Sequence, residues 1–214
     1  MKTNIGVFFG GRSTEHEISV ISANQAINAI NRDKYDVTPI YITKEGRWFT
    51  GNALLDLKNY RDIPALLRQC EEVYMRPVYG DYNLYYTNPK GVFKNKSLDC
   101  RLDIVIPVLH GANGEDGTFE GILDSIGIPY AGCDTLASAN GMDKITMKMI
   151  LRENDIPVVD YVWFTDRQWF ADRDRLIAKT ESSLGYPVIV KPANLGSSIG
   201  IGCARNREEL IEKV

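Results

Sequence analysis

The sequence predicts an α/β protein with two domains, an N-terminal parallel-sheet domain (residues 1–132) and a smaller α+β domain (residues 133–214). The first domain is predicted by two apolar runs, Ile5–Phe9 and Asp103–Leu109, each of which is followed by glycines. A buried strand, a glycine turn and a helix form the unit that opens many α/β folds. The second domain is predicted by two short β-branched runs that flank a loop rich in glycine and serine.

The first helix is expected to begin near Thr14, because Thr14 and Glu17 form the S/T-x-x-E capping-box pattern. Its apolar stripe is expected to comprise Ile18, Ile21, Ala26 and Ile30. Glu15 would lie beyond the carboxyl end of the first strand, where open α/β sheets bind ligands. Its carboxylate could hold an ammonium group, although an acid at a helix N-terminus also stabilises the helix dipole, and spacing alone favours that structural role. His16 and Arg12 are predicted to be surface residues.

The region from about residue 51 to residue 102 is predicted to be structural or a variable insertion. A strand over Val37–Ile42 precedes it. Within it, the sequence predicts a helix, two strands and a type I turn whose chain returns through Val92-Phe93: Ile63–Glu72, Val73–Val78, Leu84–Thr87 and Asn88–Gly91. Its many tyrosines are typical of a sheet face or edge.

The loop His110–Gly117 carries a histidine and two carboxylates at the end of a predicted buried strand. Ionisable side chains at this edge of a sheet favour ligand binding, so His110 is a candidate functional residue. Asp116 is instead expected to cap the next helix, Thr118–Ser125. That helix is expected to bury three residues, Phe119, Ile122 and Leu123. A last short strand is expected over residues 128–132.

The second domain is expected to alternate helices and strands: a helix Met142–Asn154, a strand Val158–Phe164, a helix Arg173–Ser183, a strand Val188–Lys191, a strand Ile199–Ile201 and a helix from Asn206. Lys144 lies near the start of its helix, where a cation opposes the helix dipole. A bound anion would offset that cost, so Lys144 could face a phosphate group, and a solvated lysine is the alternative.

The loop between Lys191 and Ile201 could point several backbone N–H groups at one anion, because glycine allows close backbone approach. Lys191 at its base suits a phosphate, although a flexible hairpin with a solvated lysine is an equal reading of the loop alone. A Walker A loop is excluded because the lysine precedes the glycines, and a dinucleotide fingerprint lacks its third glycine. Gly196–Gly200 also fits G-x-S-x-G with Ser198 as nucleophile, which leaves a serine hydrolase as a minor alternative.

The overall composition is that of an ordinary soluble protein, with 44% hydrophobic and 25% charged residues and a formal net charge of −3. No basic block indicates nucleic acid or a membrane surface as a partner. No apolar run could span a bilayer, and no signal peptide is expected. The four cysteines have no metal-type or redox-type spacing, so free thiols in the cytoplasm are expected.

Four segments together resemble the D-alanine–D-alanine ligase family of ATP-grasp enzymes: Gly10–Ser19, Leu109–Asp134, Met142–Lys144 and Pro187–Ile201. They follow one another in the family's order along nearly the whole chain. The resemblance implies a Rossmann-like, pre-ATP-grasp first domain that binds substrate and an ATP-grasp second domain. It also implies a role in peptidoglycan synthesis: ATP phosphorylates a first D-alanine, and the amine of a second one attacks the acyl phosphate.

The resemblance implies roles for eight residues of the predicted site. Glu15 would bind the ammonium group of the first D-alanine, Ser197 would hold Glu15 in a hydrogen-bonded network, and His110 would lie beside the reacting carboxyl group. ATP phosphates would contact the remaining five: Lys144, Lys191, Gly196, Ser198 and Gly200, the last three in a mobile loop that closes over them.

Family members continue well beyond 214 residues, so the chain resembles a fragment that is expected to be inactive alone. The magnesium ligands, the transition-state arginine and the adenine-binding residues of the family have no counterpart in this sequence, and no metal site is expected in it. D-Ala–D-Ser and D-Ala–D-lactate ligases remain alternatives, as does a non-catalytic relative that binds nucleotide or amino acid. Family members form homodimers through the N-terminal domain, so a homodimer is plausible.

Overall fold

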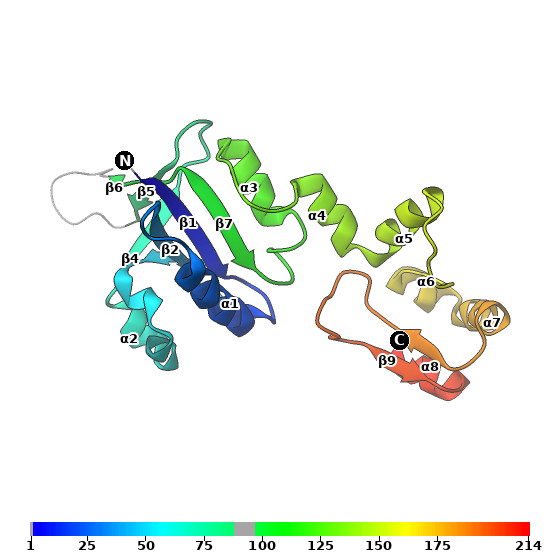
Figure 1. Ribbon diagram of the computed structural model, residues 1–214. Helices are drawn as coiled ribbons and strands as arrows, with labels where there is room; N and C mark the ends of the chain where they lie inside the picture. Colours follow the sequence, from blue (N-terminus) through cyan, green and yellow to red (C-terminus); the bar gives the residue numbers. More distant parts are fainter. Residues whose placement is uncertain (1, 88–96) are drawn as a thin grey trace. The chain divides into compact units, whose positions relative to one another are not determined.

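Figure 1 shows a computed structural model, which describes residues 2–87 and 97–214. The chain divides into two compact units, Met1–Ala139 and Asn140–Val214, and each is described by itself. The turn predicted at Asn88–Gly91 and the return through Val92-Phe93 lie outside the described residues.

Unit 1 is built on a seven-stranded sheet with the order β6-β5-β4-β3-β2-β1-β7. Its centre is parallel: β1 (Thr3–Gly10) pairs with β2 (Tyr35–Ile42) on one side and with β7 (Ile104–Leu109) on the other. Gly10 is opposite Ile42 in one pair and Leu109 in the other, so the three carboxyl ends lie at the same level. The α/β class and the parallel strands predicted from the apolar runs are confirmed.

Four antiparallel strands extend this sheet: β3 (Trp48–Thr50), β4 (Glu71–Met75), β5 (Asn83–Tyr86) and β6 (Ser97–Arg101). The last three belong to the region that was predicted to be structural or a variable insertion. Between β3 and β4 the chain forms two 3₁₀ helices and one short α-helix: η1 (Asn52–Leu55), η2 (Leu57–Arg61) and α2 (Ile63–Leu67). The helix predicted over Ile63–Glu72 is therefore half as long, because its last residues belong to β4.

Helices cover both faces of the sheet (Figure 1). The side chains of β1 alternate between these faces, as strand geometry requires. Val7 and Phe9 pack with α1 (His16–Ala29) and α2, whereas Phe8 packs with Phe119 of α3 (Thr118–Ile126). The sheet is thus buried on both sides, which explains why its central strand is almost continuously apolar.

Three expectations for α1 are wrong. The N-cap is Glu15, whose side chain makes no capping hydrogen bond, so the Thr14–Glu17 capping box does not form. Ile18 and Ile21 are 56% and 46% exposed, because α1 buries Ser19, Val20, Ala23, Asn24 and Ile27 instead. His16 is 4% exposed, not a surface residue.

Two smaller differences concern the chain around α3. Ile122 is 41% exposed rather than inside, because the buried face of α3 consists of Phe119, Glu120, Leu123 and Ile126. The short strand expected over residues 128–132 is a single parallel bridge between Val105 and Tyr130. The bridge reflects the position of β7 at the edge of the sheet, where the chain beyond α3 pairs with only this strand.

Unit 2 contains a two-stranded antiparallel sheet, β8 (Val188–Val190) and β9 (Gly202–Ala204). Helix α4 (Thr135–Met142) leads into this unit, and four more helices follow: α5 (Lys144–Glu153), α6 (Asp166–Ala171), α7 (Arg173–Ser183) and α8 (Arg207–Lys213). Its core is small and comprises Trp169, Leu176, Ile177, Val188, Ala204 and Leu210.

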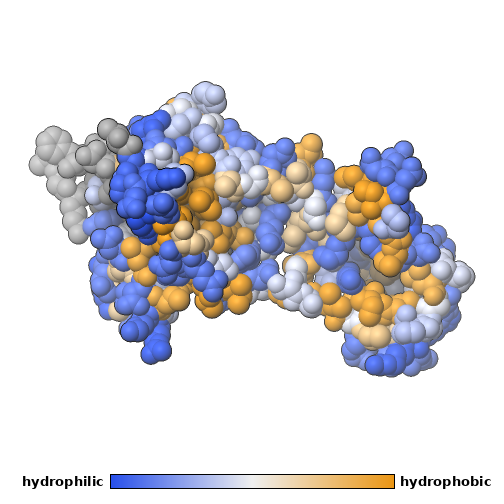
Figure 2. Space-filling view, in the orientation of Figure 1, coloured by the Kyte–Doolittle hydropathy of each residue, from blue (hydrophilic) through white to orange (hydrophobic). Residues whose placement is uncertain are grey.

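The helices predicted over Arg173–Ser183 and after Asn206 are confirmed, but two predicted strands are wrong. Residues 158–164 form no strand, since β8 and β9 pair only with each other, and Val159 is exposed. Residues 199–201 lie in turns, and β9 begins only at Gly202. Figure 2 shows hydrophobic surface on this unit, and its exposed large hydrophobic residues include Ile156, Val159 and Ile189.

Candidate functional site

Glu15 lies where the β1–α1 turn enters the helix. Its carbonyl group accepts the first helical hydrogen bond, from the Ser19 amide at 3.0 Å, and its own amide donates to Ser13 Oγ at 3.1 Å. Since the Glu15 side chain does not cap the helix, its carboxylate is directed to other partners. The turn itself is fixed from below by His16, whose Nδ1 lies 2.7 Å from the Gly11 carbonyl and whose Nε2 lies 2.9 Å from the Tyr41 hydroxyl.

The Glu15 carboxylate lies against the α-carbon of Gly111, in the loop after β7. A Cβ atom at position 111 would overlap Glu15 Oε2 and would come 3.5 Å from the Ser13 side chain. Gly111 also has a φ of 71°, which an L side chain adopts with strain. The glycine therefore allows the loop that carries His110 to approach Glu15. These two predicted site residues follow the paired strands β1 and β7 and lie at the same edge of the sheet.

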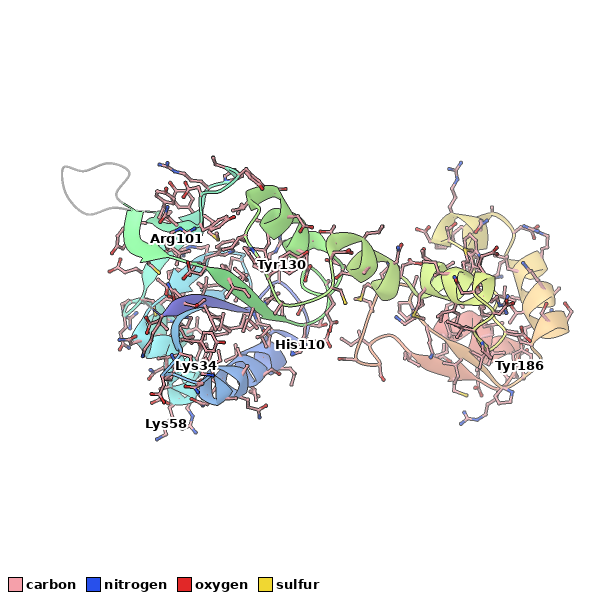
Figure 3. The ribbon with its side chains drawn as sticks, turned by 45° about the horizontal axis from the view of Figure 1, so that its top comes forward. Lys34, Lys58, Arg101, His110, Tyr130 and Tyr186 are labelled. Atoms are coloured by element: carbon pink, nitrogen blue, oxygen red, sulfur yellow. The ribbon has the colours of Figure 1, made fainter. Side chains whose placement is uncertain are left out.

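His110, labelled in Figure 3, is the first residue after β7. Its ring lies between two side chains. Nε2 lies 3.1 Å from Ser22 Oγ on α1, and Nδ1 lies 3.8 Å from Glu115 Oε1. The other oxygen of Glu115 accepts a hydrogen bond from the Gly111 amide at 2.9 Å. A carboxylate, an imidazole and a hydroxyl group thus follow one another at this edge. Ser22 was missed by sequence reasoning, since only the fold brings it to His110.

Asp116 holds the same loop together. Its carboxylate accepts hydrogen bonds from the amides of Asn113 at 2.8 Å and Thr118 at 3.0 Å. Burial opposes ionisation of Asp116, but the hydrogen bonds to Thr118 and Asn113 lower its pKa overall. This arrangement is structural, and it joins the loop to the start of α3.

Lys144 in unit 2 is hydrogen-bonded to the loop after β8. Asp143 is the N-cap of α5 and accepts a hydrogen bond from the Thr146 amide at 2.7 Å, which makes Lys144 the first helical residue. The Lys144 amide donates to the Ala193 carbonyl at 3.1 Å, and its ammonium group donates to the Leu195 carbonyl at 2.5 Å. Its charge is thus held beside the predicted phosphate loop.

The predicted phosphate loop folds into two consecutive tight turns. The Ile199 amide donates to the Gly196 carbonyl at 3.0 Å, and Ser197 and Ser198 between them have φ values of 47° and 61°. Two left-handed central residues define a type I′ turn, which glycine and asparagine favour and serine does not. Gly200 has a φ of 69°, and a Cβ atom there would lie 2.7 Å from Pro192 Cγ. Non-glycine residues in this conformation cost about 1 kcal/mol each, and such strain tends to persist where a site requires it.

Lys191 is accompanied by two cations that the sequence analysis did not single out. Burial lowers the pKa of Lys148, and the positive charges of Lys191 and Arg152 lower it further. Lys148 Nζ and Arg152 Cζ lie 4.6 and 4.7 Å from the centre of the Tyr161 ring. Lys144, Lys148 and Arg152 recur at intervals of four residues, so the helical spacing of the cations was a usable signal.

Within the described residues, no group of three or more His, Cys, Asp or Glu side chains is arranged to hold a metal ion. The chemistry available there is a carboxylate with an imidazole in unit 1 and clustered cations with a strained, glycine-rich loop in unit 2. The predicted link between Ser197 and Glu15 would join the two units and stays a prediction. None of the described helices is long and apolar enough to cross a membrane.

The fold defines a class: a mixed α/β protein of the ATP-grasp type, with ionisable side chains at the carboxyl ends of its parallel strands and a glycine-rich loop in its second unit. Solved structures support the class. The VanG D-Ala:D-Ser ligase of Enterococcus faecalis superimposes with a TM-score of 0.82 at 32% identity, over 100% of this chain and 58% of that one. The D-alanine–D-alanine ligase of Coxiella burnetii gives a TM-score of 0.85 at 27% identity, over 99% and 59%.

Two family descriptions match the sequence, "D-ala D-ala ligase N-terminus" over residues 4–133 and "D-ala D-ala ligase C-terminus" over residues 150–214. The chain belongs to the D-alanine–D-alanine ligase family. Among curated relatives, the D-alanine–D-alanine ligase of Thermosipho melanesiensis is 42% identical over 99% of this chain, and that of Natranaerobius thermophilus is 43% identical over 100%. The chain spans about half of their length, 55% and 56% respectively.

Proposed function

We propose that this chain supplies the amino-acid-binding and phosphate-binding parts of an ATP-dependent ligase that joins two D-alanines for peptidoglycan. Residues 1–132 would form the substrate-binding domain and residues 133–214 the ATP-grasp domain, a division that a family match ending at residue 133 supports. The observation that carries the proposal is the carboxylate of Glu15, which lies against Gly111 at the strand edge beside His110.

The first D-alanine would be held by its charged groups. Glu15 is partly buried, and a partly buried carboxylate attracts an ammonium group more strongly than an exposed one does. With the amine held there, the substrate carboxyl group would lie toward His110, which is adjacent to Gly111. Ser197 would hold the Glu15 network in place. Fixing the amino acid in this way contributes to catalysis by positioning, not by covalent chemistry.

The phosphates of ATP would bind to the cations of unit 2. Lys144 and Lys191 would supply charge, and the backbone of Gly196 to Gly200 with the Ser198 hydroxyl would cover the phosphates and exclude water. The γ-phosphoryl group passes to the carboxylate of the first D-alanine and ADP leaves. The amine of the second D-alanine then attacks the acyl phosphate, a peptide bond forms and phosphate is released.

Magnesium is expected with ATP in this family, but the described residues offer no cluster of ligands for it, so no step here is routed through the ion. Four cysteines without a disulfide support a cytoplasmic location, as does the use of ATP. A homodimer formed through residues 1–132 remains part of the proposal.

Binding of the two substrates by the 214-residue chain tests the proposal. Calorimetric titration should show D-alanine binding that L-alanine does not match, and this binding should weaken at least roughly 10-fold in Glu15→Gln, where the charge is lost and the shape is kept. ATP binding should weaken by a similar factor in Lys191→Ala and should not change in Lys179→Ala, an exposed lysine of α7. Equal binding of both alanine enantiomers would overturn the amino-acid site.

A D-Ala–D-Ser ligase is the second candidate, because the VanG D-Ala:D-Ser ligase is 32% identical over the whole chain. A D-Ala–D-lactate ligase differs from both in its second substrate alone. Competition between D-alanine, D-serine and D-lactate separates the three, with ADP release as the readout in a protein that joins this chain to the remaining half of a family member. Such a protein that binds substrate and releases no ADP with any acceptor would fit a non-catalytic relative.

A further inference from the structure

The Ser22 hydroxyl group is the one side chain in contact with His110 Nε2 in the described hydrogen bonds, and nothing in the proposed chemistry uses it. Ser22 lies on α1, and His110 follows β7, 88 positions along the chain. A hydrogen bond between a helix and the end of a strand is maintained only if the helix is held in a fixed position. Helix α1 must therefore be anchored to β7 for Ser22 to stay beside His110.

Helix α1 is pinned to β7 one turn before Ser22. Ser19 is fully buried, and its hydroxyl group donates to the Val108 carbonyl while it accepts a hydrogen bond from the Gly10 amide at 2.8 Å. Ser19 and Ser22 lie three residues apart on one helical face, and Val108 and His110 lie two residues apart at the end of β7. The Ser19 contacts thus set the position of Ser22 opposite the ring.

The two ring nitrogens of His110 face groups with different hydrogen-bonding capacity: Ser22 can donate, whereas Glu115 can only accept. Glu115 is a carboxylate, which can only accept, and its Oε1 lies 3.8 Å from Nδ1. A negative charge on that side favours a proton on Nδ1. The Ser22 hydroxyl group can donate, but Nε2 accepts from it only when Nε2 carries no proton. Both neighbours therefore favour the same neutral tautomer, with the proton on Nδ1.

We propose that Ser22 is a positioning residue that donates to His110 Nε2 and, with Glu115, holds the ring in one orientation and in its Nδ1–H form. The role of His110 beside the amino acid rests on the proposed function, whereas the state of its ring does not. A nucleophilic role for Ser22 is disfavoured, although serine, histidine and glutamate follow one another as in hydrolase triads. Ser22 lies within a helix, where neighbouring amides are bonded and cannot stabilise an oxyanion.

The test uses the fact that the sequence contains only two histidines, His16 and His110. Two-bond ¹⁵N–¹H spectra of the labelled chain distinguish both neutral tautomers from the imidazolium form. At about pH 8, above the ordinary range of histidine, His110 should give the Nδ1–H pattern. Ser22→Ala should shift the ratio roughly 2- to 10-fold toward Nε2–H, the value of one hydrogen bond, and Ser22→Thr, which keeps a hydroxyl group, should restore it.

His16 is an internal control, since its nitrogens are bonded to Gly11 and Tyr41 and should not respond. Ser125→Ala is the matched variant, because Ser125 is an exposed helical serine of the same unit. An Nε2–H pattern in the unmodified chain, an unchanged ratio in Ser22→Ala, or covalent labelling of Ser22 by a fluorophosphonate would each overturn the proposal. D-alanine titration of the same samples tests the proposed function separately, because a chain that fails to bind D-alanine can still give the predicted ring state.

Discussion

The α-carbon of Gly111 lies so close to the carboxylate of Glu15 that any side chain at position 111 would displace it. The overlapping atom is the end of a flexible side chain, not backbone, so the Glu15 carboxylate can move aside without a shift of the backbone. Gly111→Ala should therefore act on binding more than on folding. We expect D-alanine affinity, measured by calorimetry, to fall at least roughly 10-fold, because the displaced carboxylate no longer meets the ammonium group.

Gly80→Ala is the matched control for Gly111→Ala. Gly80 has a φ of 84°, close to the 71° of Gly111, but nothing lies within 4 Å of a Cβ atom built there. Both variants should lose about 1–2 kcal/mol of unfolding free energy in urea from the left-handed backbone alone. If Gly80→Ala weakens D-alanine binding as much as Gly111→Ala does, displacement of Glu15 is not the cause.

A second pair of glycines tests the phosphate loop. Gly200 and Gly185 both have a φ of 69°, but a Cβ atom at 200 would lie 2.7 Å from Pro192 Cγ, whereas position 185 is open. A proline ring cannot move aside as a long side chain does, so the loop backbone must shift in Gly200→Ala. ATP affinity should fall roughly 10-fold further in Gly200→Ala than in Gly185→Ala. Equal affinities would show that the conformation of Gly200 does not matter for phosphate binding.

Elements that are specified by their local sequence pattern could be predicted, whereas elements that depend on their neighbours in the fold could not. The strand Ile5–Phe9 could be predicted because a strand covered on both faces is apolar at nearly every position. Of the short antiparallel strands, β5 lies within one residue and β4 within three residues of the strands predicted at Leu84–Thr87 and Val73–Val78. Strands β3 and β6 were not predicted, because three to five residues carry too little periodicity and their pairing is settled by neighbours. Helix α1 was oriented wrongly because its buried face includes Ser19 and Asn24, whose burial is possible only through specific hydrogen bonds.

The candidate site divides in the same way. Glu15 and His110 could be expected at one edge of the sheet because both follow apolar strands, and the ends of parallel strands meet there. Spacing alone favoured a structural role for Glu15, and the family resemblance supplied its expected function. Ser22 could not be singled out, because its partner is 88 positions away and the serine has no local pattern. His16 was misplaced on the surface for a similar reason: its burial depends on Tyr41, which only the pairing of β1 with β2 brings near.

Lys144→Met should loosen the loop after β8. The ammonium group of Lys144 holds the carbonyl of Leu195, and a hydrogen bond from a charged group contributes about 1.5–3 kcal/mol before solvent screening. The amides of Ile199 and Ile201, which close the two turns, report on the loop. Their hydrogen exchange should become at least roughly 3-fold faster, with a parallel loss of ATP affinity. Lys179→Met, on an exposed part of α7, should change neither the exchange nor the ATP affinity. Unaltered exchange in Lys144→Met would show that Lys144 does not hold the loop in place.

The last prediction concerns alkaline stability. Burial, helped by the charges of Glu45 and Glu17, raises the pKa of Tyr41 to about 12. An unfolded tyrosine ionises near pH 10, so the ionisation of Tyr41 has no effect on stability below about pH 10. Above that pH the unfolded state loses the proton first, and the free energy of unfolding falls by about 1.4 kcal/mol per pH unit until the folded pKa is reached.

Tyr41→Phe should remove this contribution. At about pH 8 the variant should be less stable by about 1–3 kcal/mol, because buried His16 Nε2 loses its partner. Between about pH 10 and 12 the free energy of unfolding of the variant should fall less steeply with pH than that of the unmodified chain, because the contribution of one ionising tyrosine is absent. Urea unfolding at both pH values measures the two effects, and Tyr79→Phe, at an exposed ring, should show neither. Parallel slopes for Tyr41→Phe and the unmodified chain would mean that another group causes the alkaline loss.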